Sequence, residues 1–139
     1  MTAAAELLLD TGPLVALLHR GDRDHARCAT AFEAFRGTLL TTEPVLTESM
    51  YLLGRLAGGP AACLAFFERG GAVLVPQTRD SLGRCGELMH RYADVPIDFA
   101  DATLVALAEE TGVRRVFSLD RRGFGVFRIG ARGRFEIVP

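Results

Sequence analysis

The residues best suited to chemistry in this chain are five carboxylates, at Asp10, Glu48, Asp98, Asp101 and Asp120. Carboxylates brought close together repel one another, so they must take up protons or bind a cation. A set of oxygen ligands without histidine or cysteine suits Mg²⁺ or Mn²⁺ rather than zinc. A cation held in this way positions a phosphate and makes a water more acidic. The pattern therefore favours metal-dependent hydrolysis of a phosphodiester.

Asp10 has three chemical interpretations, because it ends an apolar run in LLLDTGPLVALL. An Asp-Thr-Gly triplet is used by aspartic proteases, but those need a β-rich chain with a hairpin flap, and most of this chain is predicted to be helical. A phosphoryl-accepting aspartate of the haloacid-dehalogenase kind expects a second aspartate two residues later, where this chain has Gly12. The third interpretation, a metal ligand at the mouth of a parallel sheet, fits the other carboxylates best.

Each carboxylate also has a purely structural interpretation. Asp10 and Asp98 stand where helices begin, so either could cap a helix, with Asp101 completing a variant capping box three residues after Asp98. Glu48 lies among apolar residues in VLTESMYLL, where a salt bridge would account for it, and Asp120 follows a predicted strand as a turn residue would. Asp101 is the hardest to explain structurally, since its neighbours in FADATLVAL are apolar.

Composition indicates an ordinary globular protein with an uneven charge distribution. At 139 residues, with 49% hydrophobic and 24% charged residues, the chain matches one domain spanning 1–139. The net charge is −1, but residues 112–139 hold seven arginines against two acids, which suggests a polyanion near an acidic site. Three cysteines without a C-x-x-C pair are expected to be buried thiols of a cytoplasmic protein. No signal peptide or membrane span is predicted.

Strands alternate with helices in the predicted secondary structure. Strands are expected at Glu6–Leu9, Thr38–Thr41, Ala72–Val75, Val113–Ser118 and Phe135–Val138. In the first half of the chain, helices are expected after Thr11, after Asp22 or Asp24, from Glu43 to near Gly58-Gly59-Pro60, and over Ala61–Glu68. Phe35 is expected on the apolar stripe of the second of these helices. In the second half, helices are expected from Thr78 or Asp80 to about Tyr92 and from Asp98 to about Thr111. This alternation predicts an α/β fold with a mostly parallel sheet, whose ligands bind at the carboxyl ends of the strands.

Four segments carry a resemblance to a known family. They are LLLDTGPLVALL, TTEPVLTESMYLL, YADVPIDFADATLVALAEETG and VFSLDRRGFGVFRI, and in this order and spacing they resemble PIN-domain proteins, especially the VapC-type ribonuclease toxins of bacterial toxin–antitoxin pairs. The acidic set is specific only in combination. The resemblance covers nearly the whole chain and implies a three-layer α/β/α sandwich with the first strand in the centre.

The resemblance also implies roles for individual residues. The metal-binding acids of the family correspond to Asp10, Glu48, Asp101 and Asp120, with Asp98 as an accessory acid and Ser118 as a hydroxyl residue that organises the site. One departure is Gly123, since many relatives carry a further acid or a histidine just before the position of Phe124. That departure leaves the number of metal ions open.

The implied function is Mg²⁺- or Mn²⁺-dependent endoribonuclease action, blocked by a small antitoxin protein, in a homodimer. Arg121 and Arg122 would hold the RNA backbone; their alternative is a solvated or antitoxin-facing patch. The alternative function is a non-catalytic PIN fold that binds RNA or antitoxin, and the intact acidic set argues against it.

Overall fold

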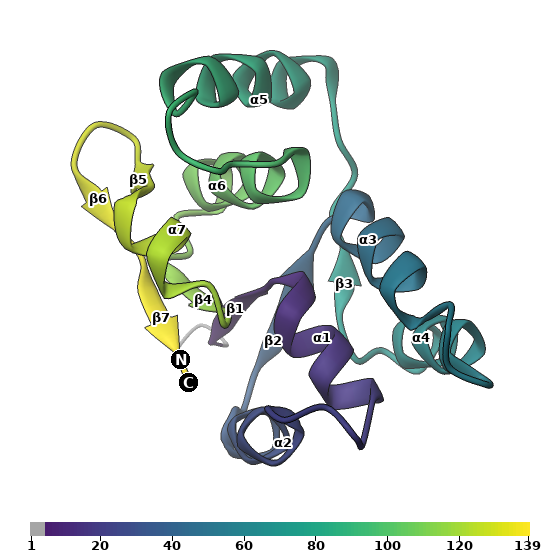
Figure 1. The fold of residues 1–139 in the computed structure, drawn as a ribbon. Helices are drawn as coiled ribbons and strands as arrows, with labels where there is room; N and C mark the ends of the chain where they lie inside the picture. The colour runs from purple at the N-terminus through teal and green to yellow at the C-terminus, as the bar shows by residue number, and fades with distance from the viewer. Residues whose placement is uncertain (1–4) are drawn as a thin grey trace.

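A parallel β-sheet forms the centre of the molecule in the computed structural model, which describes residues 5–139 (Figure 1). Its five strands lie in the order β3-β2-β1-β4-β7, and each neighbouring pair is parallel. The strands are Glu6–Leu9 (β1), Thr38–Thr41 (β2), Val73–Leu74 (β3), Arg115–Phe117 (β4) and Glu136–Val138 (β7). Leu7, Leu8 and Leu9 of β1 are fully buried. The predicted central position of the first strand is therefore confirmed.

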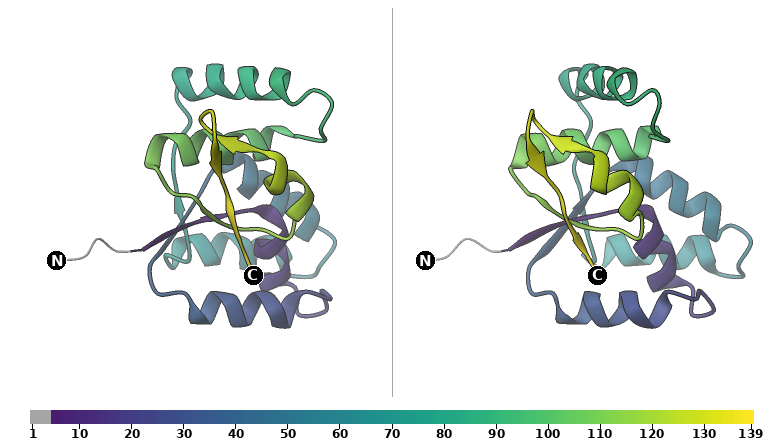
Figure 2. Two further views of the ribbon diagram at one scale, coloured as in Figure 1. Left: turned by 90° about the vertical axis from the view of Figure 1, so that its left-hand side faces the viewer. Right: turned by 60° about the vertical axis from the view of Figure 1, so that its left-hand side comes forward.

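Within residues 5–139, seven helices complete the fold. They are Thr11–Leu18 (α1), His25–Ala34 (α2), Glu43–Leu53 (α3), Gly59–Glu68 (α4), Arg79–Arg91 (α5), Phe99–Thr111 (α6) and Arg121–Val126 (α7). Figure 2 shows α5 and α6 on one side of the sheet and α1, α2 and α4 on the other. Helix α3 contacts α1, α4 and α6. The predicted three-layer α/β/α sandwich is confirmed.

Helix α6 is packed on almost all of its sides. Every residue from Ala102 to Ala108 is buried, as is Ala100. A helix that is apolar around most of its circumference belongs in a protein interior. Asp101 lies at the start of this helix, between Ala100 and Ala102, so its carboxylate is held close to the core by the packing of the whole helix.

The order of the strands along the sheet changes direction at β1. β1 has β2 on one side and β4 on the other, so the connections after β1 and before β4 run over opposite faces. A crevice opens at such a point in doubly wound sheets and is the usual place for a ligand. The Asp10 N–H donates to the Phe117 carbonyl at 3.0 Å, which joins the ends of β1 and β4 just below that crevice.

Two predicted helix boundaries are wrong. Gly59 and Pro60 were expected to end the third helix, but α3 ends at Leu53 and these two residues begin α4. Proline suits a first helical turn as well as a helix end, and the left-handed Gly58, with φ of 75°, makes the turn between the two helices. Phe35 follows α2 in an extended conformation instead of continuing its apolar stripe.

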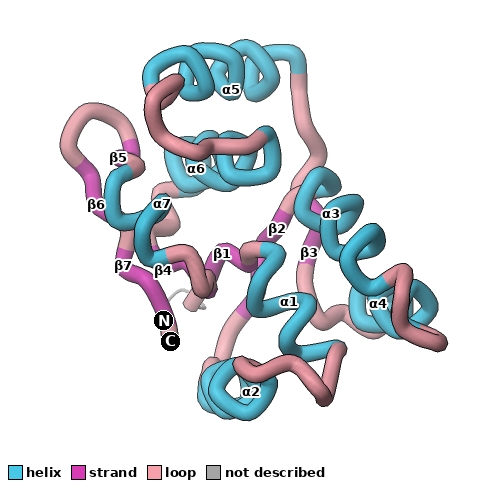
Figure 3. Tube along the Cα trace, viewed as in Figure 1, coloured by secondary structure: helices cyan, strands magenta, loops and turns pink. Residues whose placement is uncertain are grey.

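The arginine-rich segment contains structure that was not predicted. Helix α7 follows β4, and a two-stranded antiparallel hairpin, Arg128–Ile129 (β5) and Gly133–Arg134 (β6), stands apart from the main sheet (Figure 3). Phe124 and Phe127 are fully buried and stack edge-to-face beneath it. Among residues 5–139, no helix combines the length and the apolar character needed to cross a membrane.

Candidate functional site

Asp10 is a buried carboxylate at the boundary between β1 and α1, and only 7% of it is exposed. It stands at the N-cap position of α1, but its side chain makes no capping hydrogen bond. Burial raises the pKa of Asp10 to about 6; the Ser118 hydroxyl opposes this shift, and the charges of Glu48 and Asp120 add to it. The helix-cap interpretation therefore does not account for this carboxylate.

Ser118 connects the ends of β1 and β4. Its hydroxyl donates to Oδ2 of Asp10 at 2.7 Å and accepts from the Asp120 N–H at 2.9 Å, and the residue is 1% exposed. The Asp120 backbone is thereby tied to the Asp10 carboxylate. The organising role that the resemblance suggested for Ser118 stays a prediction, and these two hydrogen bonds are the geometry on which it depends.

Asp98 and Asp101 form a reciprocal capping box at the start of α6. Oδ1 of Asp98 accepts from the Asp101 N–H at 2.8 Å, and Oδ2 of Asp101 accepts from the Asp98 N–H at 3.2 Å. Burial raises the pKa of Asp101 to about 8; the backbone hydrogen bond from Asp98 opposes the shift, and the charges of Asp98, Asp10 and Asp120 add to it. The two interpretations of this pair are therefore compatible, because one pair of carboxylates caps the helix and also contributes to a crowded acidic site.

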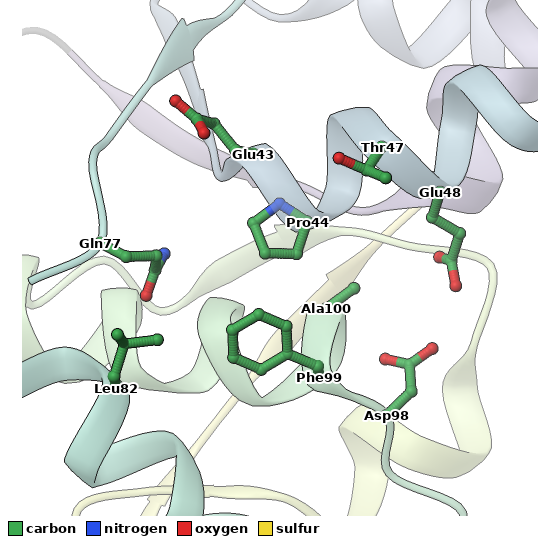
Figure 4. A pocket seen from close by; sticks show the side chains of 9 residues that line it. All are labelled: Glu43, Pro44, Thr47, Glu48, Gln77, Leu82, Asp98, Phe99 and Ala100. Carbon is green, nitrogen blue, oxygen red and sulfur yellow. The ribbon is translucent and has the colours of Figure 1, made fainter.

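Glu48 approaches from the other side of the crevice, on α3. Burial raises its pKa, the Thr11 hydroxyl partly offsets this, and the nearby Asp98 charge raises it further. Figure 4 shows the carboxylates of Glu48 and Asp98 turned toward each other. A salt bridge was the structural alternative for Glu48, and among residues 5–139 no arginine or histidine pairs with it.

Asp120 caps α7, with Oδ1 accepting from the Gly123 N–H at 2.9 Å. A Cβ atom at Gly123 would collide with Oδ2 of Asp120 and would press on the Phe127 ring. Glycine at this position therefore leaves the room that the Asp120 carboxylate needs to cap α7.

The structure brings the five predicted acids to one edge of the sheet from four separate segments of the chain. Asp10 is influenced by Glu48 and Asp120, Asp101 by Asp98, Asp10 and Asp120, and Glu48 by Asp98. The ion pairs of the described chain leave all five without a cationic partner. Desolvation and the neighbouring acids raise the pKa values of Asp10 and Asp101, and carboxylates crowded in this way hold protons or accept a cation.

The donor set fits a hard divalent cation, although the side chains do not form a finished cage. Within residues 5–139, no three Asp, Glu, His or Cys side chains stand together at metal-ligand positions. The capping bonds use one oxygen each of Asp98, Asp101 and Asp120 and leave the second oxygen of each for another partner. Oxygen ligands of this kind match Mg²⁺ and Mn²⁺.

Arg121 and Arg122 lie beside the acids without pairing to them. Both are exposed at the start of α7, and the Arg121 guanidinium donates to the Pro139 carbonyl. Arg122 lines a hollow of about 420 Å³ together with Asp120. Of the two, Arg122 is therefore the one that shares a hollow with one of the five acids, Asp120.

Several hydroxyls at the site had not been singled out in the sequence. The Thr42 and Thr103 hydroxyls are 2.8 Å apart in the core and tie the start of α3 to α6, which places Glu48 relative to Asp101. Thr11 Oγ1 is buried without a well-formed hydrogen bond. All three residues lie within a few positions of the acids, in LDTG, TTEP and DAT, so their proximity in sequence was an available signal.

Comparison with known proteins gives the family. The PIN domain matches residues 7–128. The chain belongs to the PIN domain family. Ribonuclease VapC26 of Mycobacterium tuberculosis is 27% identical over 135 residues, covering 96% of this chain and all of that protein.

Solved structures of PIN-domain toxins share the fold. VapC20 of Mycobacterium tuberculosis, described as a toxin that cleaves the sarcin–ricin loop, is 24% identical and superposes with a TM-score of 0.79 over 96% of this chain and 99% of its own. A toxin–antitoxin complex from Klebsiella pneumoniae contains a chain that is 19% identical, with a TM-score of 0.68 and 96% coverage of both chains. The predicted likeness to VapC-type PIN toxins is confirmed.

Proposed function

We propose that this PIN-domain protein is an endoribonuclease toxin that hydrolyses RNA phosphodiester bonds with Mg²⁺ or Mn²⁺ and is inhibited by a cognate antitoxin. The observation that carries the proposal is the convergence of five carboxylates, from four segments, without a cationic partner. A fold needs no such arrangement, because buried like charges destabilise it. The named ribonuclease relative and the toxin–antitoxin complex among similar folds support the same reading.

The roles of individual residues follow from their positions. Asp10, Glu48, Asp101 and Asp120 would hold the cation directly or through water, and Asp98 would fix Asp101 through the capping box. Ser118 keeps the Asp10 carboxylate oriented. The chemistry that the cation supplies when bound is acidification of the attacking water and neutralisation of charge at the phosphate. Arg121 and Arg122 would attract the RNA backbone to an otherwise acidic edge.

A non-catalytic PIN fold that binds RNA or antitoxin is the alternative. Loss of one core acid would favour it, and none is lost. A homodimer located in the cytoplasm is part of the proposal and follows from the resemblance to VapC-type toxins.

Cleavage of RNA by the purified protein tests the proposal. A panel that includes tRNA and rRNA should be cut in Mg²⁺ or Mn²⁺ and protected by EDTA, and Asp10→Asn should remove the activity. Asp80→Asn is the matched control, because Asp80 is an exposed aspartate in the first turn of α5 whose charge is not among those that raise the pKa values of the five acids. Survival of the whole panel at high enzyme and metal concentrations would contradict the proposal.

A further inference from the structure

A hollow of about 560 Å³ adjoins the carboxylates and shares Glu48 and Asp98 with them (Figure 4). It lies between the first turns of α3 and α6, the segment before α5, and α5 itself. The volume falls within the range of about 300–1,000 Å³ that is usual for small-molecule sites. The residue roles proposed above do not use this hollow.

The floor of the hollow is apolar and partly aromatic. Phe99 is 40% exposed and Leu82 is 49% exposed, and Pro44 and Ala100 complete the surface. Since 40% of Phe99 stays exposed at the start of α6, part of its ring surface is available to a ligand. No arginine, lysine or histidine lines the hollow. An anionic phosphate is therefore a poor occupant, and a neutral, flat group is a good one.

Gln77 supplies a directional polar group at the rim. Its Oε1 accepts from the Ser81 hydroxyl at 3.0 Å, which fixes the orientation of the amide. Figure 4 shows the amide nitrogen of Gln77 on the side of the hollow that faces Pro44. The free N–H groups can thus donate to an acceptor on the edge of a ring stacked on Phe99.

We propose that this hollow binds one unpaired nucleobase of the RNA next to the scissile phosphate, with Phe99 stacking on the base and Gln77 donating to its edge. The proposal rests on the proposed function, because the carboxylates that would act on the phosphate form one wall of the hollow. Stacking on an aromatic ring tolerates any base, whereas the Gln77 contact discriminates among them. Neutral bases also tolerate the acidic wall better than a sugar–phosphate backbone would.

Two variants separate stacking from base reading. Phe99→Ala should weaken binding of short single-stranded RNA by about tenfold, and Phe99→Trp should restore it. Tyr51→Ala is the matched control, since Tyr51 is an exposed aromatic residue on α3 that does not line the hollow. Gln77→Ala should flatten the preference for one base beside the cleavage point, measured by sequencing products from a randomised RNA pool, while Phe99→Ala should leave that preference in place.

Binding is measured without cleavage by the fluorescence of RNA that carries 2-aminopurine, with the Asp101→Asn protein in EDTA. Phe99-dependent quenching supports the base subsite, and it does so even if wild-type protein cuts no RNA, in which case the nuclease proposal alone fails. If wild-type protein cuts RNA while Phe99→Ala changes neither quenching nor base preference, the subsite is overturned and the nuclease stands. The subsite is likewise overturned if Phe99→Ala weakens only antitoxin binding, because the hollow is then a protein contact. If the protein neither cuts RNA nor shows quenching, both proposals are overturned.

Discussion

Helices α5 and α6 pack against each other, and both begin with a capping box, which is made from different residues in each helix. In α5, the Thr78 hydroxyl accepts from the Ser81 N–H at 3.0 Å and the Ser81 hydroxyl accepts from the Thr78 N–H at 2.7 Å. In α6, Asp98 and Asp101 make the equivalent pair of bonds. Two hydroxyls therefore suffice to start a 13-residue helix in this fold.

The difference between the two boxes lies in charge. An acidic residue near a helix N-terminus gains about 0.3–1 kcal/mol from the helix dipole at the surface, and Asp80 already provides this for α5. For Asp101, burial and neighbouring acids outweigh any such gain, since they raise its pKa to about 8. Capping alone therefore does not explain aspartates at α6, whereas the cation-binding role proposed above would explain them.

The most direct test of this difference replaces the charged capping box of α6 with the hydroxyl capping box of α5. Asp98→Thr combined with Asp101→Ser copies the α5 box into α6. The helix start should survive, with the free energy of unfolding in EDTA changed by no more than about 1 kcal/mol. RNA cleavage should fall by at least about a hundredfold, equivalent to about 2.7 kcal/mol of transition-state stabilisation. Thermal unfolding measures the change in stability and initial rates measure the change in cleavage, with Thr78→Ser as a control. Undiminished cleavage would show that neither aspartate belongs to the site.

Two serines extend the comparison to individual hydroxyls. Ser118 and Ser81 are both buried, and each hydroxyl accepts from a backbone N–H. Ser118→Ala should reduce cleavage by about ten- to hundredfold, the usual effect of losing an outer partner of a metal ligand. Ser81→Ala should instead cost about 1 kcal/mol of stability and leave the rate unchanged. If both variants lost only stability, Ser118 would be a structural residue.

The predictable part of the site was its position at the strand ends. Apolar runs such as Glu6–Leu9 followed by an acid place that acid at the carboxyl edge of a parallel sheet, and the Asp98–Asp101 spacing correctly indicated a capping box. The partner of Asp10 was not predictable from local sequence, because Ser118 lies 108 positions away and meets it only when β1 pairs with β4. Tertiary contact decided that the Asp10 side chain would not cap α1.

Helix α7 in the C-terminal segment could not be predicted from the pattern of the sequence. RRGFGV contains two glycines, which weaken a helix, and is too short for an apolar period, yet it forms α7. Two aromatic residues, Phe124 and Phe127, hold it against the core. Burial of large aromatic rings outweighs the weak helix propensity of this segment. The sequence by itself does not predict which aromatic rings come into contact in the folded protein.

The pH dependence of stability sharpens the account of the acids. The folded protein holds protons on Asp10 and Asp101 more tightly than the unfolded chain does. In EDTA, the free energy of unfolding should therefore fall as pH rises from about 4 to 6 through Asp10 and on toward 8 through Asp101, by at most about 1.4 kcal/mol per pH unit for each group. Above pH 8 it should level off. Urea unfolding across this range provides the measurement.

Asp10→Asn tests the lower half of that range. The variant lacks the titrating group, so its stability should change less between pH 4 and 6 and should equal or exceed that of the wild type at neutral pH. Mn²⁺ should stabilise the wild-type protein by mass action and the variant much less. A large loss of stability in Asp10→Asn at neutral pH, but not in Asp80→Asn, would assign Asp10 a structural role instead.

The smallest expected effect separates Asp98 from Asp101. Asparagine caps a helix about as well as aspartate, so Asp98→Asn keeps the bond to the Asp101 N–H and tests the charge alone. Asp98 is exposed and its carboxylate faces Glu48, so we expect about a tenfold loss of cleavage, or about 1.4 kcal/mol. Asp98→Ala should lose a further 1 kcal/mol or so of stability, from the missing cap. Asp101→Asn should lose far more activity, since it removes the charge of a carboxylate placed to hold the cation. Equal losses in the two asparagine variants would give Asp98 the same direct role as Asp101, and the charged box would then serve the cation with both of its members.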